Sequence, residues 1–504
     1  MKKKYSVILA ILILIFTVSA SVVQASPPYK SYTYTYTKNV AWAAPAPVPY
    51  VPSRIIDSKT IGAELIQPED MFFAKDGSIY IVNGGFKGNI LVLDSEWNLK
   101  KVIDQFDNNG KADKFNNPTG VFVTDKGDIY VADMNNGRVV VLDKDGNYKR
   151  EYGKPTDVTY NKDVHEYKPK KVAVDSNNNI FLIVQGDNNG IVEINEEGYF
   201  EGYVGANKVK VNPALVLWKR IMTKEQVEQL EKFVPQEYSN LSLDDQGFIY
   251  ALAATEGASN PIKRLNPTGE DVLVRNGWTG VNGDTISTKA LYNQVTGDSG
   301  LSLFADITSD SEGYYSALDG KRGRIFTYNK NGDLLYVFGG MGSQKGTFGL
   351  PVAIENRAGK IYVVDKKNKN ITEFEVTEYA KLIRQADSQY LDGQYEDCME
   401  TWKKVLKMNA NFELAYVQTG NVYLRQQKYE EAMKYYMLGN YRGNDSTGYS
   451  KAFDGYKKQF LRQHFSKILT IAVILFVGLY VFIKIRNRRK KKDKFDITME
   501  GVAE

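Results

Sequence analysis

Cysteine and histidine are almost absent from this chain of 504 residues. It has one cysteine, Cys398, and two histidines, His165 and His464. One cysteine excludes an intramolecular disulfide and any zinc site built from several cysteines. Two histidines far apart in sequence argue against a metal held by two or three imidazoles. No Ser/His/Asp set, phosphate-binding loop or metal-ligand motif is present either, so the sequence predicts no metal and no cofactor.

The net charge of +5 is unevenly distributed along the chain. Residues 51–375 hold about 38 Lys and Arg against about 45 Asp and Glu, and the positive excess lies at the two ends. A protein with an acidic body is poorly suited to binding a phosphate backbone. We therefore expect no nucleic-acid partner.

The N-terminal end has the pattern of an export signal. A basic start, Lys2 to Lys4, precedes an apolar run from about Val7 to Val18, and small residues end at Ala25. This pattern predicts a signal peptide at residues 1–25, with an uncleaved signal anchor as the alternative. In both cases the residues that follow are exported.

A second apolar run, Ile468 to Ile483, lies near the other end and carries no charge. Flanking Lys467 and Lys484 can reach the membrane surfaces, which extends the run to a transmembrane helix at 467–485. A buried core helix is the alternative. The basic tail at 486–504 should stay in the cytoplasm. The sequence thus predicts a single-pass plasma-membrane protein with its main body outside, and its composition favours a Gram-positive bacterium.

The middle of the chain repeats one unit six times. Each copy has a hydrophobic strand often opened by proline, an Asp/Asn–Gly type of turn, an Ile/Phe–Tyr strand, and a third strand. Glycine or asparagine supplies the positive φ of a tight hairpin. One small sheet cannot bury both of its faces, so such units close into a ring. We predict a mainly β, six-bladed propeller at residues 53–376. The copies run through Pro68–Asp94, Asn117–Asp143, Pro169–Asn195, Tyr238–Asn266, Phe304–Asn329 and Pro351–Phe374.

The repeat resembles the NHL repeat of the gluconolactonase-like and NHL propeller superfamily. The matching residues are Phe115, Pro118 and Gly120 at the opening of the second copy, and Asn136, Arg138 and Val139 in its third strand. The resemblance covers roughly residues 54–376 and implies an NHL-type propeller. The last copy lacks its own outer strand, because the chain turns helical after Phe374. We expect a strand near Ser53 to Ile61 to close the ring.

Three segments depart from the repeat. In residues 26–52, Tyr/Thr alternation from Tyr32 to Thr37 and an Ala/Pro-rich part predict a short exposed strand and a stiff linker, with a disordered stalk as the alternative. Residues 213–234 have helical spacing and predict a helical insertion over one mouth of the propeller, either a packed decoration or a lid. Residues 275–300 predict only a long loop.

From Glu378 the hydrophobic period changes to that of helices. Small residues and large aromatic residues recur at an offset that lets paired helices approach. This pattern resembles the tetratricopeptide repeat, without the proline at each repeat end. The resemblance implies two repeats and a capping helix within residues 378–465, and a groove for a protein or peptide partner. The aligned pairs are Ala386 with Gly420, Cys398 with Ala432, Trp402 with Tyr436, and Val405 with Gly439.

Some propellers are enzymes, and the channel carries the candidate site. The gluconolactonase family, which the propeller resembles in layout, holds a divalent cation at its channel. Its opening Gly-Pro reads Gln67-Pro68 here, and its later Pro-Asn-Gly reads Pro118-Thr119-Gly120. Glu69, Asp70 and Asp306 stay as candidate binding residues at the channel mouth, because first-strand ends point there; capping of turns is the alternative.

These expectations favour binding over catalysis. We expect a membrane-anchored extracytoplasmic binding or scaffold protein, associated with an envelope or uptake complex. Its propeller would take a carbohydrate or another small molecule, and its helical repeats a protein or peptide. The alternative is a divalent-metal-dependent, gluconolactonase-like hydrolase at the channel. A signalling receptor is a third class, and it would need a partner chain because residues 486–504 are too few to fold.

Overall fold

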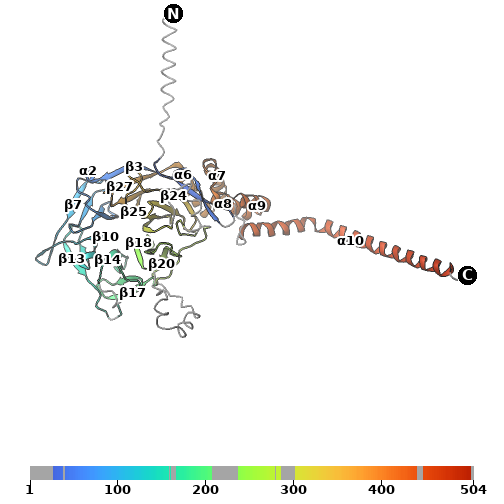
Figure 1. Cartoon of the computed structure of the whole chain (residues 1–504), viewed down its shortest axis with the longest axis horizontal. Helices are drawn as coiled ribbons and strands as arrows, with labels where there is room; N and C mark the ends of the chain where they lie inside the picture. The colour runs from blue at the N-terminus through green and yellow to red at the C-terminus, as the bar shows by residue number, and fades with distance from the viewer. Residues whose placement is uncertain are drawn as a thin grey trace, which may run out of the picture. The chain divides into compact units, whose positions relative to one another are not determined.

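Small antiparallel sheets are arranged around a common centre in the computed structural model of the chain (Figure 1). The structure describes residues 27–37, 40–157, 159–160, 166–206, 237–277, 280–284, 301–439 and 447–500. The predicted signal peptide and the predicted helical insertion at 213–234 lie outside these residues, as does most of the predicted loop at 275–300.

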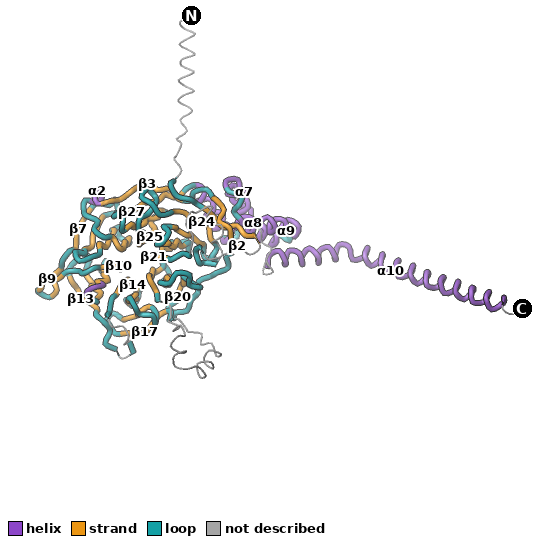
Figure 2. Tube along the Cα trace, in the orientation of Figure 1, coloured by secondary structure: helices purple, strands orange, loops and turns teal. Residues whose placement is uncertain are grey.

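The fold is a six-bladed β-propeller. In Figure 2 the first strand of each sheet lies toward the centre and the last lies at the rim. The first strands are β4 (Pro68–Phe73), β10 (Pro118–Val123), β14 (Pro169–Val174), β18 (Tyr238–Leu243), β21 (Phe304–Ser309) and β25 (Pro351–Arg357). The second are β5 (Ile79–Asn83), β11 (Ile129–Asp133), β15 (Ile180–Val184), β19 (Ile249–Ala253), β22 (Tyr315–Asp319) and β26 (Lys360–Asp365). The third are β6 (Asn89–Leu93), β12 (Arg138–Leu142), β16 (Ile191–Ile194), β20 (Ile262–Leu265), β23 (Arg324–Tyr328) and β27 (Asn370–Val376).

Outer strands complete five of the sheets, and the sheet of β18 has three strands among the described residues. A short hairpin, β8 with β9, follows the first blade, and a 3-10 turn, η1, follows β11. The outer strands are β7 (Leu99–Ile103), β13 (Tyr148–Tyr152), β17 (Phe200–Val204), β24 (Leu334–Gly339) and β3 (Tyr50–Asp57). The hairpin and turn are β8 (Phe106–Asn108), β9 (Lys111–Asp113) and η1 (Met134–Asn136).

The first hairpin of each blade forms as the repeat predicts. Gly77 and Gly127 take φ of 90° and 86° in these turns, and Asn178 takes 66° at the copy without glycine. Asparagine tolerates this conformation better than most residues because its short polar side chain bonds locally. The second strands β5 and β11 are buried along their whole length. Neighbouring blades cover both of their faces, which explains their continuous hydrophobic sequence.

The N-terminal strand β3 closes the ring. It pairs antiparallel with β27, from Asp57 opposite Asn370 to Tyr50 opposite Val376. The expected closing strand is therefore confirmed, although it ends earlier than predicted. Residues 58–61 form a short helix, α2 (Ser58–Ile61), because the Asp57 carboxylate accepts a hydrogen bond from Thr60 N at 2.9 Å.

The predicted strand from Tyr32 to Thr37 is present, but its first half is buried rather than exposed, and part of the predicted linker forms a second strand. Two strands, β1 (Tyr32–Thr37) and β2 (Val40–Pro45), form a hairpin. Tyr32 pairs with Val337 of β24, so the hairpin extends the fifth blade to six strands. Tyr32 and Tyr34 are only 1% and 7% exposed. The Tyr/Thr alternation suggested an exposed strand, but the side chains of these two tyrosines of β1 are buried.

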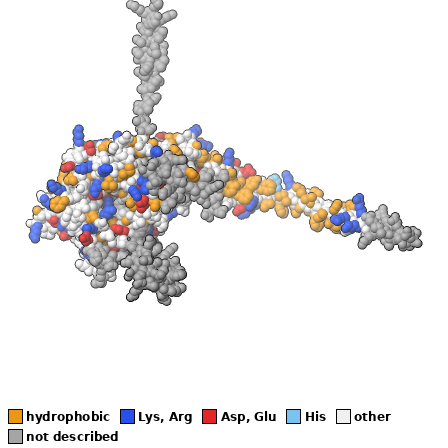
Figure 3. Space-filling model, in the orientation of Figure 1, with side chains coloured by type: hydrophobic (Ala, Val, Ile, Leu, Met, Phe, Trp, Pro, Cys, Tyr) orange, Lys and Arg blue, Asp and Glu red, His pale blue; other side chains and the backbone are white. Residues whose placement is uncertain are grey.

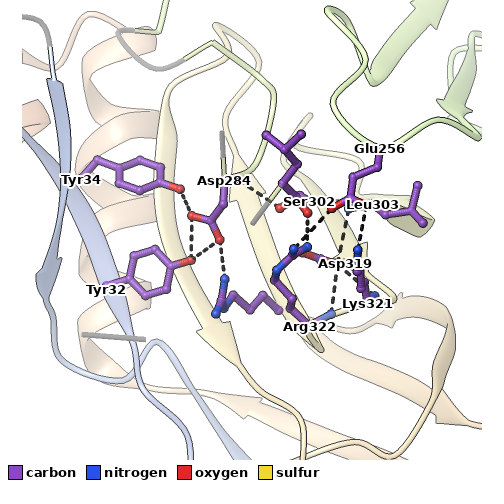
Figure 4. A network of polar contacts seen from close by, with 11 residues as sticks. Tyr32, Tyr34, Glu256, Asp284, Ser302, Leu303, Asp319, Lys321 and Arg322 are labelled. Atoms are coloured by element: carbon purple, nitrogen blue, oxygen red, sulfur yellow. Dashed lines mark hydrogen bonds and ion pairs between the residues drawn. The ribbon is translucent and has the colours of Figure 1, made fainter. Parts of the chain in front are cut away.

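A buried carboxylate, Asp284, fastens this hairpin to the fifth blade (Figure 4). Its Oδ2 accepts a hydrogen bond from Tyr32 Oη at 2.9 Å, and Tyr34 Oη donates to its Oδ1. Arg324 Nη1 lies 2.6 Å from Oδ2 and balances the charge. Burial, followed by the charge of Asp284, raises the pKa of both tyrosines well above its usual value, so both remain hydrogen-bond donors.

We expect Tyr34→Phe to lower the free energy of unfolding by about 1.5 kcal/mol, because it removes one hydrogen bond to a buried charged group. The measurement is urea unfolding of the detergent-solubilised chain. Tyr199→Phe is the matched control: Tyr199 is 68% exposed, and its change should stay within about 0.5 kcal/mol. Equal effects of the two substitutions would contradict a fastening role for Asp284.

Several helices follow the propeller. They are α6 (Glu378–Leu391), α7 (Tyr395–Met408), α8 (Glu413–Arg425), α9 (Tyr429–Leu438) and α10 (Thr447–Glu500). The chain divides into two compact units, residues 1–385 with 404–411 and residues 386–403 with 412–504.

Side chains inside the second unit pack as the aligned pairs suggest. A Cβ on Gly420 would lie 3.0 Å from the ring of Tyr436, so a larger residue would separate α8 from α9. Trp402 is fully buried, and its Nε1 donates to Gln418 Oε1 at 3.2 Å. Cys398 is also buried, and burial raises the pKa of its thiol to about 12, so it is an inert core residue. Membership of the tetratricopeptide family stays a prediction.

The last helix, α10, includes the predicted membrane span. Its segment Gly448–Lys490 is the single candidate span among the described residues, with a mean hydropathy of 2.6 and no burial in its most apolar window. Hydrophobic side chains cover this part of α10 in Figure 3. A core helix of a soluble protein would be mostly buried, so the exposure of this stretch favours a membrane anchor.

Candidate functional site

A cavity of about 120 Å³ lies in the central channel, between the first strands of the blades. Each first strand has a bulge after its opening residue, for example between Pro68 and Asp70 and between Pro169 and Lys171. The repeat therefore places one residue of each blade at an equivalent third position. These residues are Asp70, Gly120, Lys171, Asn240, Asp306 and Ala353. The equivalent fifth positions hold Phe72, Phe122, Ala173, Ser242, Thr308 and Glu355.

An ion pair between Asp70 and Lys171 spans the channel. Lys171 Nζ lies 2.6 Å from Asp70 Oδ1, and both side chains are at least nine-tenths buried. The second oxygen of Asp70 accepts a hydrogen bond from Val121 N at 3.1 Å. Burial alone would lower the pKa of Lys171, but Asp70 and then Asp306 outweigh this and raise it. Lys171 is thus a fixed cation in the channel.

Asp306 is held by amide groups on both of its oxygens. Its Oδ1 accepts from Asn240 Nδ2 at 2.8 Å and from Ile307 N at 2.9 Å, and its Oδ2 accepts from Ile354 N at 2.8 Å. Burial raises the pKa of this carboxyl to about 7, against the opposing effect of Lys171. Asp306 therefore keeps its proton to a higher pH than an ordinary aspartate does.

Glu355 is the least satisfied acid of the channel. The Thr308 hydroxyl donates a long hydrogen bond to its Oε2, with Oγ1 at 3.4 Å. Burial raises the pKa of Glu355 well above its usual value, and the neighbouring Asp306 and Asp70 raise it further. Among the described residues that line the cavity, Asp70, Asp306 and Glu355 are acidic and Lys171 is the one basic residue.

The structure brings two of the three predicted residues together. Asp70 and Asp306 both line the cavity, whereas Glu69 does not. Glu69 is the extra residue of the bulge in β4, and its carboxylate pairs with Lys366 in the loop between β26 and β27.

Sequence reasoning missed Lys171, Asn240 and Glu355. The repeat pattern could have identified Lys171 and Asn240, because they occupy the same position in their repeats as Asp70 and Asp306. Counting from the opening residue of each blade would have found them.

The channel does not fit a divalent cation of the kind implied by the gluconolactonase resemblance. The Lys171 ammonium already lies against Asp70, and N–H groups occupy both oxygens of Asp306. Divalent cations such as Ca²⁺ need several free oxygen ligands. Among the described residues, no group of three His, Cys, Asp or Glu has the arrangement of a metal site.

A family comparison agrees with the repeat. Residues 115–142, which include β10, β11 and β12, match the family model described as NHL repeat. The second blade of the propeller thus contains an NHL repeat. No curated protein matches the sequence of the chain.

Solved structures of low sequence identity also resemble it. Virginiamycin B lyase from Staphylococcus aureus is 12% identical with a TM-score of 0.40, and the match covers 65% of this chain and 100% of that one. A streptogramin B lyase is 14% identical with a TM-score of 0.38, over 70% and 95%. A protein of unknown function from Bacteroides thetaiotaomicron is 13% identical with a TM-score of 0.40, over 69% and 91%.

Proposed function

We propose that this NHL-repeat propeller is a membrane-anchored, extracytoplasmic binding or scaffold protein. Its propeller and helices lie outside the plasma membrane, α10 crosses it, and the basic residues after the span face the cytoplasm. The distribution of charge supports this orientation, because Arg486, Arg488 and Arg489 follow the apolar stretch directly.

We favour binding over catalysis because the channel cavity is small and contains a buried ion pair. An engineered cavity of about 150 Å³ just holds a benzene molecule. The channel cavity, at about 120 Å³, is smaller, and the ion pair of Lys171 with Asp70 lies within it. A whole sugar or lactone would have to break this pair and leave a buried charge without a partner, which is costly. Recognition over the face of the propeller avoids that cost.

The helices after the propeller would supply a second binding surface. Their paired arrangement and the small residue Gly420 at a close helix approach support tetratricopeptide repeats. Such repeats would hold a protein or peptide partner, such as a component of an envelope or uptake complex. The propeller would hold a small-molecule or carbohydrate ligand near the membrane.

The orientation can be tested by cysteine labelling of intact cells. Cys398→Ala provides a cysteine-free background, into which Lys126→Cys or Asn487→Cys is introduced; both positions are exposed. A membrane-impermeant maleimide should label the Lys126→Cys protein in intact cells and the Asn487→Cys protein only after permeabilisation. The reverse pattern, or labelling of neither before permeabilisation, would contradict export of the propeller.

A further inference from the structure

Two aromatic rings, which we call the aromatic wall, line the channel cavity. Phe72 and Phe122 lie on neighbouring first strands, with ring centroids 5.0 Å apart and the planes inclined at 53°. Both rings line the cavity together with Thr308 and Glu355. The site thus combines apolar ring surface with carboxylates.

Among the described residues of the cavity, the acidic groups outnumber the cation. Asp70 is paired with Lys171, and Asp306 accepts hydrogen bonds from three N–H groups. Glu355, by contrast, has one long contact with a hydroxyl. The charged groups that face it are Asp70 on β4, Lys171 on β14 and Asp306 on β21. A second cation beside Glu355 would stabilise the ionised form of this carboxyl.

Size restricts what that cation can be. The cavity of about 120 Å³ holds a group smaller than benzene, so a head group and its first methylenes fit and a larger body stays outside. An ammonium donates up to three hydrogen bonds, which carboxylate and hydroxyl oxygens accept. Aromatic rings attract ammonium groups and pack against aliphatic stems.

We propose that the channel cavity binds a primary ammonium group at the end of a slender aliphatic chain, with Glu355 as its counter-ion and Phe72 and Phe122 as its wall. The inference rests on the proposed binding function and gives it a ligand class. The amine has two sources, a free small molecule or a lysine side chain of a partner protein, and both present the same chemistry.

Two amine probes and a neutral probe test the proposal on the full chain in detergent. Calorimetric titrations use n-butylammonium, Nα-acetyl-lysine amide and, as the neutral probe, 1-butanol, at constant ionic strength. Saturable binding of either amine without binding of 1-butanol supports the proposal, and the tighter amine identifies the source. Equal binding of 1-butanol, or no saturable binding of either amine, overturns it.

Glu355→Gln keeps the size of the side chain and removes its charge, so we expect the dissociation constant of the bound amine to rise tenfold or more. Glu270→Gln is the matched control, because Glu270 is exposed and forms no side-chain ion pair among the described residues. Phe122→Leu, which keeps the charge, should weaken binding severalfold. Unchanged affinity in Glu355→Gln would overturn the assignment.

Binding should also depend on pH. Because burial raises the pKa of Glu355, its carboxyl keeps its proton to a higher pH than a free glutamate does, and binding of an ammonium group must displace that proton. We expect affinity to increase with rising pH and protons to be released on binding. The opposite dependence would overturn the proposal. Failure of these titrations would leave the labelling test of orientation unaffected, so the two proposals can fail separately.

Discussion

Shortening one side chain of the closing strand, Ile56→Ala, is expected to lower the free energy of unfolding by about 2–5 kcal/mol. Ile56 is fully buried and packs in one cluster with Ile371 of the partner strand and Leu65. The substitution leaves a cavity where β3, which precedes the first blade in sequence, pairs with β27 of the last blade. Because this pairing closes the ring, we also expect a broader, less cooperative thermal transition.

Arg54→Ala is the control for this prediction. Arg54 lies on the same strand, two residues away, and its side chain is exposed. Its effect on the free energy of unfolding should stay within about 0.5 kcal/mol. Differential scanning calorimetry of the detergent-solubilised chain measures both variants. Similar transitions for the two would show that β3 can be lost without opening the ring.

The ring of blades could be predicted because every blade repeats the same order of hydrophobic strands and turn residues. Turn residues such as Gly77 and Gly127 and the strands beside them are short-range signals, and the number of copies sets the number of blades. The closing strand was also predictable, because the sixth copy, ending at Phe374, lacked its outer strand. The sixth blade lacked an outer strand, and an unassigned strand preceded the first blade. Pairing of the two was therefore the simplest way to complete the sheet.

The hairpin β1–β2 could not be predicted in the same way. Tyr32 pairs with Val337, and Asp284 lies far from both in sequence. Tyr/Thr alternation fits an exposed strand as well as an outer strand with one face covered. The contacts with Val337 and Asp284 decide between an exposed strand and an outer strand. The sequence around Tyr32 carries no signal that identifies these two residues.

The candidate site was partly predictable for a related reason. Acidic residues near strand ends, such as Asp70 and Asp306, are recognised as candidate ligands from their residue type. Lys171 is recognised only when the six sequence repeats are aligned. The misplacement of Glu69 follows from the bulge after Pro68, since one extra residue changes which side chain faces the channel. A pattern of alternation cannot locate such a bulge.

The channel gives the second large expected effect. Lys171→Met should lower the free energy of unfolding by about 3–5 kcal/mol at pH 8, because it leaves the buried carboxylate of Asp70 without its cation. Lys149→Met is the control: Lys149 pairs with Asp128 at the surface, where such a pair contributes about 0–1 kcal/mol. Urea unfolding at constant ionic strength measures both variants.

The deficit of Lys171→Met should shrink as the pH falls. Asp306 has a folded-state pKa of about 7, and that of Glu355 is also raised, so the folded protein binds these protons more tightly than the unfolded chain does. The stability linked to Asp306 is present at acidic pH and is lost as the pH rises through its folded-state pKa of about 7, and that linked to Glu355 also falls with rising pH. Lys171 opposes both shifts, so its removal enlarges the loss at pH 8 more than at pH 5.

A double variant separates this charge effect from a loss of packing. Adding Asp70→Asn to Lys171→Met removes the carboxylate that was left unpaired, so the double variant should be more stable than Lys171→Met alone at pH 8. If the double variant is no more stable, and the deficit of Lys171→Met is the same at pH 5 and pH 8, Lys171 acts as a filler of space. The channel would then contain no electrostatic imbalance for an ammonium ligand to relieve.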